Sequence, residues 1–100
     1  MKQGTTPTHI FNVGIDKKLI SKVKIIYAQG DKIVLTKMTE DCTIADKKIS
    51  VKLTQEETLR FTANSNVNIQ LRILTVNNDA LVSNVFSVQC GVLLDKGVLE

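Results

Sequence analysis

Residues 67–73 read Val-Asn-Ile-Gln-Leu-Arg-Ile, and this stretch decides the fold class. Apolar side chains occupy every second position, and polar or charged side chains fill the positions between them. Successive side chains of a β-strand point to opposite faces of a sheet. The period of two therefore predicts a strand with one buried face and one solvated face.

The same alternation recurs along the chain and predicts further strands. The strands predicted from it lie at residues 23–27, 33–36, 49–53 and 86–90, with a weaker one at 10–15 and a short one at 42–45. Turn-forming residues lie between several of these stretches, at 29–31, 46–48 and 77–79. Because Gly, Asn and Asp tolerate positive φ angles, these positions are typical of tight hairpins.

One stretch departs from the strand pattern. Thr54-Gln55-Glu56-Glu57 has the T-x-x-E form of a capping box, in which Thr54 and Glu57 satisfy each other's backbone amides. Leu59 and Phe61 follow with apolar side chains. We therefore predict a short helical turn over residues 54–61 that crosses from one sheet to another.

Six or seven short strands with turns at regular spacing predict an all-β fold. The favoured architecture is an antiparallel β-sandwich with an immunoglobulin-like outline, and the alternative is a small barrel. The chain has no tryptophan, so the Cys-Trp-Cys signature of true immunoglobulin domains is missing. The comparison with immunoglobulins therefore concerns architecture alone.

Size and composition favour one folded domain. The chain has 100 residues, of which 43% are hydrophobic, and contains no proline-rich or glycine-rich linker. We predict a flexible polar arm at residues 1–8 and a single β-sandwich domain at residues 9–100. The closing pair Leu99-Glu100 has the form of a cloning scar.

Targeting features are missing from the sequence. No apolar run is long enough to span a bilayer, and the first residues lack the apolar core of a signal peptide. The two cysteines, Cys42 and Cys90, do not form a disulfide framework. These features predict a cytoplasmic protein without a membrane partner.

Groups that carry catalysis are also missing, and we predict that the chain is not an enzyme. The single histidine, His9, has no partners at metal-ligand spacing, so neither a metal nor another cofactor is expected. Acidic neighbours would raise the pKa of Cys42, which argues against a nucleophile, and Cys90 has the phase of a core residue. Isolated glycines provide no phosphate-binding loop.

Lysines form two clusters that could meet as a basic patch. The members of the candidate patch are Lys17, Lys18, Lys22, Lys24, Lys47, Lys48 and Lys52. Acidic residues interrupt the pattern, the formal net charge is only +3, and four aromatics offer few platforms for stacking bases. A solvated sheet face with lysine-protected edges is the favoured interpretation, and nucleic acid is not the expected partner.

The C-terminal tail is the candidate interaction segment. It carries five apolar side chains in a short stretch, namely Val92, Leu93, Leu94, Val98 and Leu99. If these side chains are exposed, they form an unusual apolar surface for a monomer. The favoured alternative is that the tail forms the last strand and packs on its own core.

Several stretches together resemble a known group of proteins. They are QGTTPTHIF at residues 3–11, VKIIYAQ at 23–29, TEDC at 39–42, VKLTQEETL at 51–59, VNIQLRIL at 67–74 and the late Ser83. The chain resembles small structural proteins, tail or baseplate related, of phages and prophages of low-GC Gram-positive bacteria. It also resembles the N-terminal β-sandwich module of upper baseplate proteins.

The resemblance covers nearly the whole chain, and its motifs are structural ones. It implies a role in virion assembly through contacts with other virion proteins or with copies of the same chain. It further implies a location in the host bacterial cytoplasm during assembly, after which the protein either stays in the virion or is left behind as an assembly factor. The alternatives are a stand-alone ligand-binding module and, behind it, a nucleic-acid-binding accessory protein.

Overall fold

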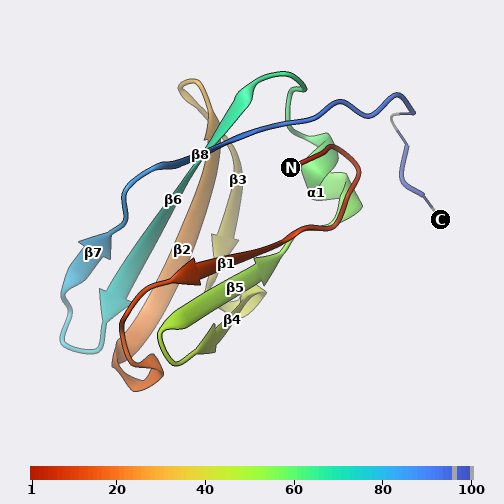
Figure 1. The fold of residues 1–100 in the computed structure, drawn as a ribbon. Helices are drawn as coiled ribbons and strands as arrows, with labels where there is room; N and C mark the ends of the chain where they lie inside the picture. The colour runs from red at the N-terminus through yellow and green to blue at the C-terminus, as the bar shows by residue number, and fades with distance from the viewer. Residues whose placement is uncertain (96, 100) are drawn as a thin grey trace.

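The computed structural model describes residues 1–95 and 97–99, which fold into two antiparallel sheets (Figure 1). The first sheet has the order β1 (Thr8–Asn12), β5 (Lys48–Lys52), β4 (Cys42–Ala45). The second has the order β3 (Lys32–Met38), β2 (Ile20–Gln29), β6 (Asn66–Thr75), β7 (Ala80–Val82), and β8 (Phe86–Gln89) also pairs with β6. The predicted antiparallel β-sandwich is confirmed. Residue 100, the predicted end of the domain and part of the Leu99-Glu100 pair, lies outside the described residues.

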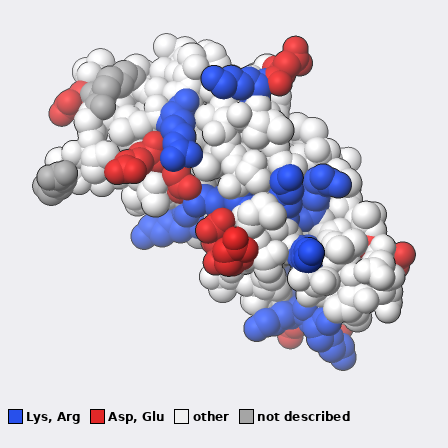
Figure 2. All heavy atoms as spheres, turned by 180° about the vertical axis from the view of Figure 1, so that it is seen from behind, with Lys and Arg blue, Asp and Glu red and all other residues white. Residues whose placement is uncertain are grey.

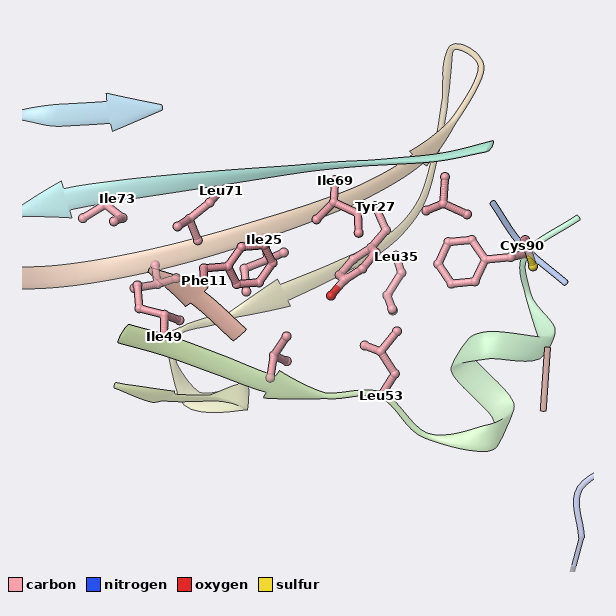
Figure 3. Packing of buried hydrophobic residues seen from close by; sticks show 14 residues of the cluster. Phe11, Ile25, Tyr27, Leu35, Ile49, Leu53, Ile69, Leu71, Ile73 and Cys90 are labelled. Carbon is pink, nitrogen blue, oxygen red and sulfur yellow. The ribbon is translucent and has the colours of Figure 1, made fainter. Parts of the chain in front are cut away.

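The core lies between the two sheets, and the alternating positions fill it (Figure 3). The buried apolar residues come mainly from β2, β5 and β6 and include Val23, Ile25, Tyr27, Ile49, Val51, Val67, Ile69, Leu71 and Ile73. The stretch that decided the fold class therefore buries all four of its apolar side chains. Burying such side chains contributes roughly 1.5–3 kcal/mol each relative to leaving them exposed.

The three predicted hairpin turns join β2 to β3, β4 to β5 and β6 to β7. Each contains a residue with a positive φ angle: Gly30 at 59°, Lys47 at 64° and Asn78 at 64°. Glycine and asparagine adopt this conformation at low cost, which explains two of the three positions. Lys47 adopts it without that advantage.

The predicted capping box is present at helix α1 (Gln55–Leu59). Thr54 N donates to Glu57 Oε1 at 2.8 Å, and Glu57 N donates to Thr54 Oγ1 at 3.2 Å. The helix follows β5 of the first sheet and precedes β6 of the second, so it makes the predicted crossing. Two 3₁₀ turns, η1 (Lys17–Leu19) and η2 (Thr39–Asp41), complete the elements.

Strand boundaries at the chain ends differ from the prediction. The first strand covers Thr8–Asn12 rather than residues 10–15. It ends before Gly14, whose φ of 66° leaves the extended region. Eight strands occur among the described residues, against six or seven predicted, because the short strand β7 at Ala80–Val82 precedes the predicted last strand, which is β8.

Strands β7 and β8 both pair with β6, but their registers differ by one residue. Leu81 pairs with Ile73 and Phe86 pairs with Ile69, so residues 83–85 lie opposite only Gln70 and Leu71 of β6. Ser83 fills the irregular site, since its hydroxyl accepts from Leu71 N at 2.9 Å. An extra residue of this kind bends a strand and re-aims its side chains, as in a β-bulge.

Residues 1–8, predicted as a flexible arm, contact the domain in this structure. Lys2 forms a parallel bridge with Gly91 beyond the end of β8. The Gln3 side chain is buried, with Nε2 donating to Phe61 O at 2.6 Å and Oε1 accepting from Leu93 N at 3.2 Å. The first residues therefore join α1, the core and the tail at one end of the sandwich.

Replacing Gln3 by alanine is expected to lower the free energy of unfolding by about 1–3 kcal/mol, because a buried carbonyl loses its donor. Urea unfolding followed by circular dichroism measures the change. Thr6→Ala, at an exposed position of the same segment, is the control, and it should change the free energy by less than about 0.5 kcal/mol. Equal effects of the two substitutions would show that the Gln3 contacts add no stability.

Candidate functional site

On one side of the sandwich, an edge of the first sheet lies opposite an edge of the second sheet, and no strand of the described residues closes the space between them. Strand β1 is the edge of the first sheet, and the divided strand β7–β8 is the edge of the second. Phe11 of β1 and Phe86 of β8 approach each other across this side, with ring centroids 6.0 Å apart. We call this region the open side.

A cleft of about 240 Å³ lies in the open side, and its lining is mostly apolar. The lining residues are Phe11, Asn12, Val13, Ile15, Leu71, Ile73, Leu81, Val82, Ser83 and Phe86. Leu71 and Ile73 are inward-facing core residues of β6, so the cleft reaches the core between the two sheets. A second hollow, lined by residues 8–12 with Ile69 and Phe86, continues along β1.

The rim of the open side exposes large apolar side chains. Phe86 is 47% exposed and Leu81 is 42% exposed, and both pair with buried residues of β6. Ile10 and Val82 are 62% and 57% exposed on the outer faces of the two sheets that end here. The sequence predicted Phe86 on the buried face of its strand. Phe86 pairs with the buried Ile69 and its ring lies near Phe11, but its position at the sheet edge leaves the side chain exposed. Large apolar side chains exposed at both sheet edges are a feature of interaction sites.

Charge is missing from both walls of the open side. No Asp, Glu, Lys or Arg occurs between Gln3 and Ile15, or between Ala80 and Leu94, although charged residues make up 23% of the chain. Edge strands of monomeric proteins usually carry charged residues, especially lysine, that prevent pairing with another chain. Strands β1, β7 and β8 have no such protection.

The free edge of β1 carries regularly spaced backbone groups. Val13 N donates to Lys47 O at 2.9 Å, and Leu53 N donates to Pro7 O at 2.9 Å. The backbone N–H and C=O groups of the odd-numbered residues of β1 therefore point toward β5. In an antiparallel ladder the intervening residues point the other way. The amide and carbonyl groups of Thr8, Ile10 and Asn12 therefore point toward the open side, where an added strand could pair with them.

The tail, residues 91–99, forms no strand among its described residues apart from the bridge at Gly91. Leu94 is 94% exposed and Leu99 is 84% exposed, and Val92 and Val98 are exposed as well. Leu93 is half-buried and lies beside Gly4. Polar contacts hold the far end, since Gln55 of α1 bonds both the N–H and the carbonyl of Leu99.

The structure brings only part of the lysine set together. Lys17 and Lys18 of η1 lie beside the β4–β5 turn with Lys47, where Lys17 N donates to Asp46 Oδ1 at 3.3 Å. On their strands, Lys22 and Lys24 alternate with buried residues of the second sheet, and Lys48 and Lys52 alternate with buried residues of the first. The two pairs therefore face outward on opposite sides of the sandwich. Figure 2 shows Lys and Arg in small groups, several of them beside acidic residues.

Two pairs of titratable side chains lie between the sheets, one of them with a member on β1. The Lys37 ammonium is 2.6 Å from Glu57 Oε2, with side-chain exposures of 10% and 15%. His9 Nδ1 lies 2.7 Å from the Tyr27 hydroxyl. Burial lowers the pKa of His9 and raises that of Tyr27, so the contact joins a neutral imidazole to a protonated phenol, and the imidazole tautomer sets which of them donates. These contacts satisfy the inward-facing polar groups.

Cys42 has the environment of an unreactive thiol. Burial first, and then the negative charge of Asp41, raise the pKa of this thiol above its usual range. We expect iodoacetamide to modify Cys42 of the folded chain more slowly than the same cysteine in urea, because the thiolate is the reacting form. Peptide mass spectrometry over a pH series separates Cys42 from the buried Cys90. Faster modification in the folded state would indicate an activated nucleophile.

Two kinds of feature are absent from the described residues, namely metal-binding clusters and membrane-spanning helices. No group of three or more His, Cys, Asp or Glu side chains among them could hold a metal ion. Within those residues, no helix has the length and apolar character needed to cross a bilayer.

Sequence reasoning found the tail and the lysines but missed the open side. The sequence signal is the absence of charged residues from two stretches. Residues 3–15 contain β1, and residues 80–94 contain β7 and β8. Their meaning depends on topology, because two segments at opposite ends of the chain become the edges of the same cleft only in the folded state.

Comparison with known proteins adds one structural likeness. No protein-family model and no curated protein matches the sequence. The chain is similar in structure to the V domain of amphioxus IgVJ-C2, with 11% sequence identity and a TM-score of 0.35. The match covers 93% of this chain and 97% of that chain. Two antiparallel sheets define the protein as an all-β sandwich.

Proposed function

We propose that the chain is a structural or assembly protein of a phage or prophage virion, tail or baseplate related. It acts by docking onto other protein chains rather than by turnover. The observation that carries the proposal is the open side, whose charge-free edges and exposed apolar rim are suited to pairing with another chain. The resemblance over residues 3–11, 51–59 and 67–74 adds the virion context.

Physical chemistry favours protein as the partner of this surface. Unpaired strand edges provide main-chain hydrogen bonds, and an apolar cleft provides pockets for alternate side chains of an added strand. A nucleic acid would require a basic surface, whereas the open side has no Lys or Arg between Gln3 and Ile15 or between Ala80 and Leu94. The site therefore suits a flat or extended apolar protein segment.

Fractionation of a lysate from the strain that encodes the chain tests the proposal. After prophage induction, the chain should sediment with virions or with their assembly intermediates, where peptide mass spectrometry identifies it. The host cytoplasm should contain it during assembly. Detection of the chain only as a free protein in every fraction, through a complete induction, would contradict the proposal.

A further inference from the structure

The two sheets differ in width at the open side. The first sheet has three strand positions, β1-β5-β4, whereas the second has four, because β7 and β8 share the last position beside β6. No strand of the first sheet among the described residues lies beyond β1. The apolar cleft lies between that edge and β7–β8. Its position is therefore that of one further strand beside β1.

The chain contains a segment that fits such a position. Residues 91–94 are Gly-Val-Leu-Leu, with no charge and no proline. In an extended segment Val92 and Leu94 would point to the same face, because side chains alternate. Both are exposed in the free chain, Leu94 almost completely so.

We propose that the tail, residues 91–99, of one copy lies beside β1 in the open side of a second copy. Val92 and Leu94 enter the apolar cleft, and the tail backbone pairs with the free groups of Thr8, Ile10 and Asn12. This inference rests on the proposed function and deepens it, since it names a second copy as a partner. The contact is head-to-tail, so it generates a ring or a filament.

Charge matching supports a tail in this cleft. Both walls and residues 91–94 are uncharged, so docking leaves no buried charge without a partner. Asp95, the first charged residue after them, would lie where the segment leaves the cleft. The pairing also adds main-chain hydrogen bonds along an edge that is otherwise unprotected.

A second copy fits the geometry better than the chain's own tail does. The tail leaves the domain near α1, where Gln55 holds Leu99. Strand β7, beside the cleft, lies at the far end of the sandwich from α1 (Figure 1). The tail therefore leads away from its own cleft and toward a neighbouring molecule.

Sedimentation equilibrium over a range of concentrations tests the contact with one tail variant and one cleft variant. Leu94→Lys and Leu81→Lys, at the position paired with the buried Ile73, should each raise the concentration of half-association at least about 30-fold, because a lysine would be buried without a partner. Ile33→Lys is the control, since Ile33 is 62% exposed on β3, away from the open side. It should leave association unchanged.

Mixing the two defective variants gives a sharper result. The Leu94→Lys chain keeps an intact cleft, and the Leu81→Lys chain keeps an intact tail. Their mixture should therefore form dimers that grow no larger. A wild-type chain that stays monomeric, an association that Leu94→Lys leaves unchanged, or a mixture that forms no dimer would each overturn the proposal.

The tail contact and the proposed function would be contradicted by different results. A monomeric chain that nevertheless sediments with virions would remove the tail contact and leave the assembly role. A chain that associates through its tail but never enters particles or their intermediates would do the reverse. Circular dichroism of each variant verifies that it folds before its mass is interpreted.

Discussion

Replacing Phe61 by alanine is expected to lower the free energy of unfolding by about 3–5 kcal/mol, the largest effect of any single substitution considered. Phe61 is 1% exposed, and its ring contacts Tyr27 edge-on at a centroid distance of 6.0 Å. Truncation removes apolar contacts and leaves a cavity where α1 meets the core. Since small domains have only about 5–15 kcal/mol of stability, the variant should be close to unfolding.

Urea unfolding at a concentration below association measures the loss. Phe86→Ala is the matched control, because it removes the same type of side chain from a position that is 47% exposed on the open side. Its cost should be about 1 kcal/mol or less, with a larger effect on association than on folding. Equal destabilisation by the two substitutions would contradict the assignment of Phe61 to the core and Phe86 to the surface.

Replacing Glu57 by glutamine is expected to lower the free energy of unfolding by about 3 kcal/mol, at the low end of values for breaking a buried ion pair. The change leaves the Lys37 ammonium, 10% exposed, without its partner. Glutamine at this position can still accept from Thr54 N, so the capping box is retained. The substitution therefore isolates the charge of Glu57 from its capping role.

The pH dependence of this effect has a defined sign. Burial alone would raise the pKa of Glu57, but hydrogen bonds from Lys37 and Thr54 outweigh it and leave the pKa lowered. A lowered pKa in the folded state stabilises the fold above the unfolded pKa of about 4.3, and the gain is lost as the pH falls through the folded pKa. The difference between wild type and Glu57→Gln should therefore shrink in acid.

Two further variants separate the pair from other effects. Glu56→Gln removes an exposed acid from the same helix and should cost less than about 0.5 kcal/mol. The double variant Lys37→Met, Glu57→Gln should recover most of the loss, because no unpaired charge remains. A double variant as unstable as Glu57→Gln alone would show that the ion pair is not the source of the effect.

Local patterns in the sequence predicted the interior of the fold. Alternation at residues 23–27, 49–53 and 67–73 identified three strands whose inward residues are buried. The capping box at Thr54 identified α1, and turn residues identified the three hairpins. These features are local, because each depends on side chains only a few residues apart.

Features that depend on distant partners were not predicted. Lys37 has the inward phase of Leu35 on its strand, and its burial depends on Glu57 from another element, which no local pattern identifies. Ile33 has the phase of a core residue, but the register change between Tyr27 and Ala28 alters its pairing, and it is 62% exposed. The open side likewise requires segments 3–15 and 80–94 to meet, and no local pattern specifies that meeting.

Hydrogen exchange at single residues tests most directly the claim that the open side is a contact surface. Exchange is measured on the wild-type chain below and above its association concentration. We predict that the amides of Thr8, Ile10 and Asn12 and those of residues 92–94 exchange much more slowly in the associated state. Unchanged exchange at all of these amides, with protection gained instead on the lysine-bearing faces of β2 or β5, would contradict the account.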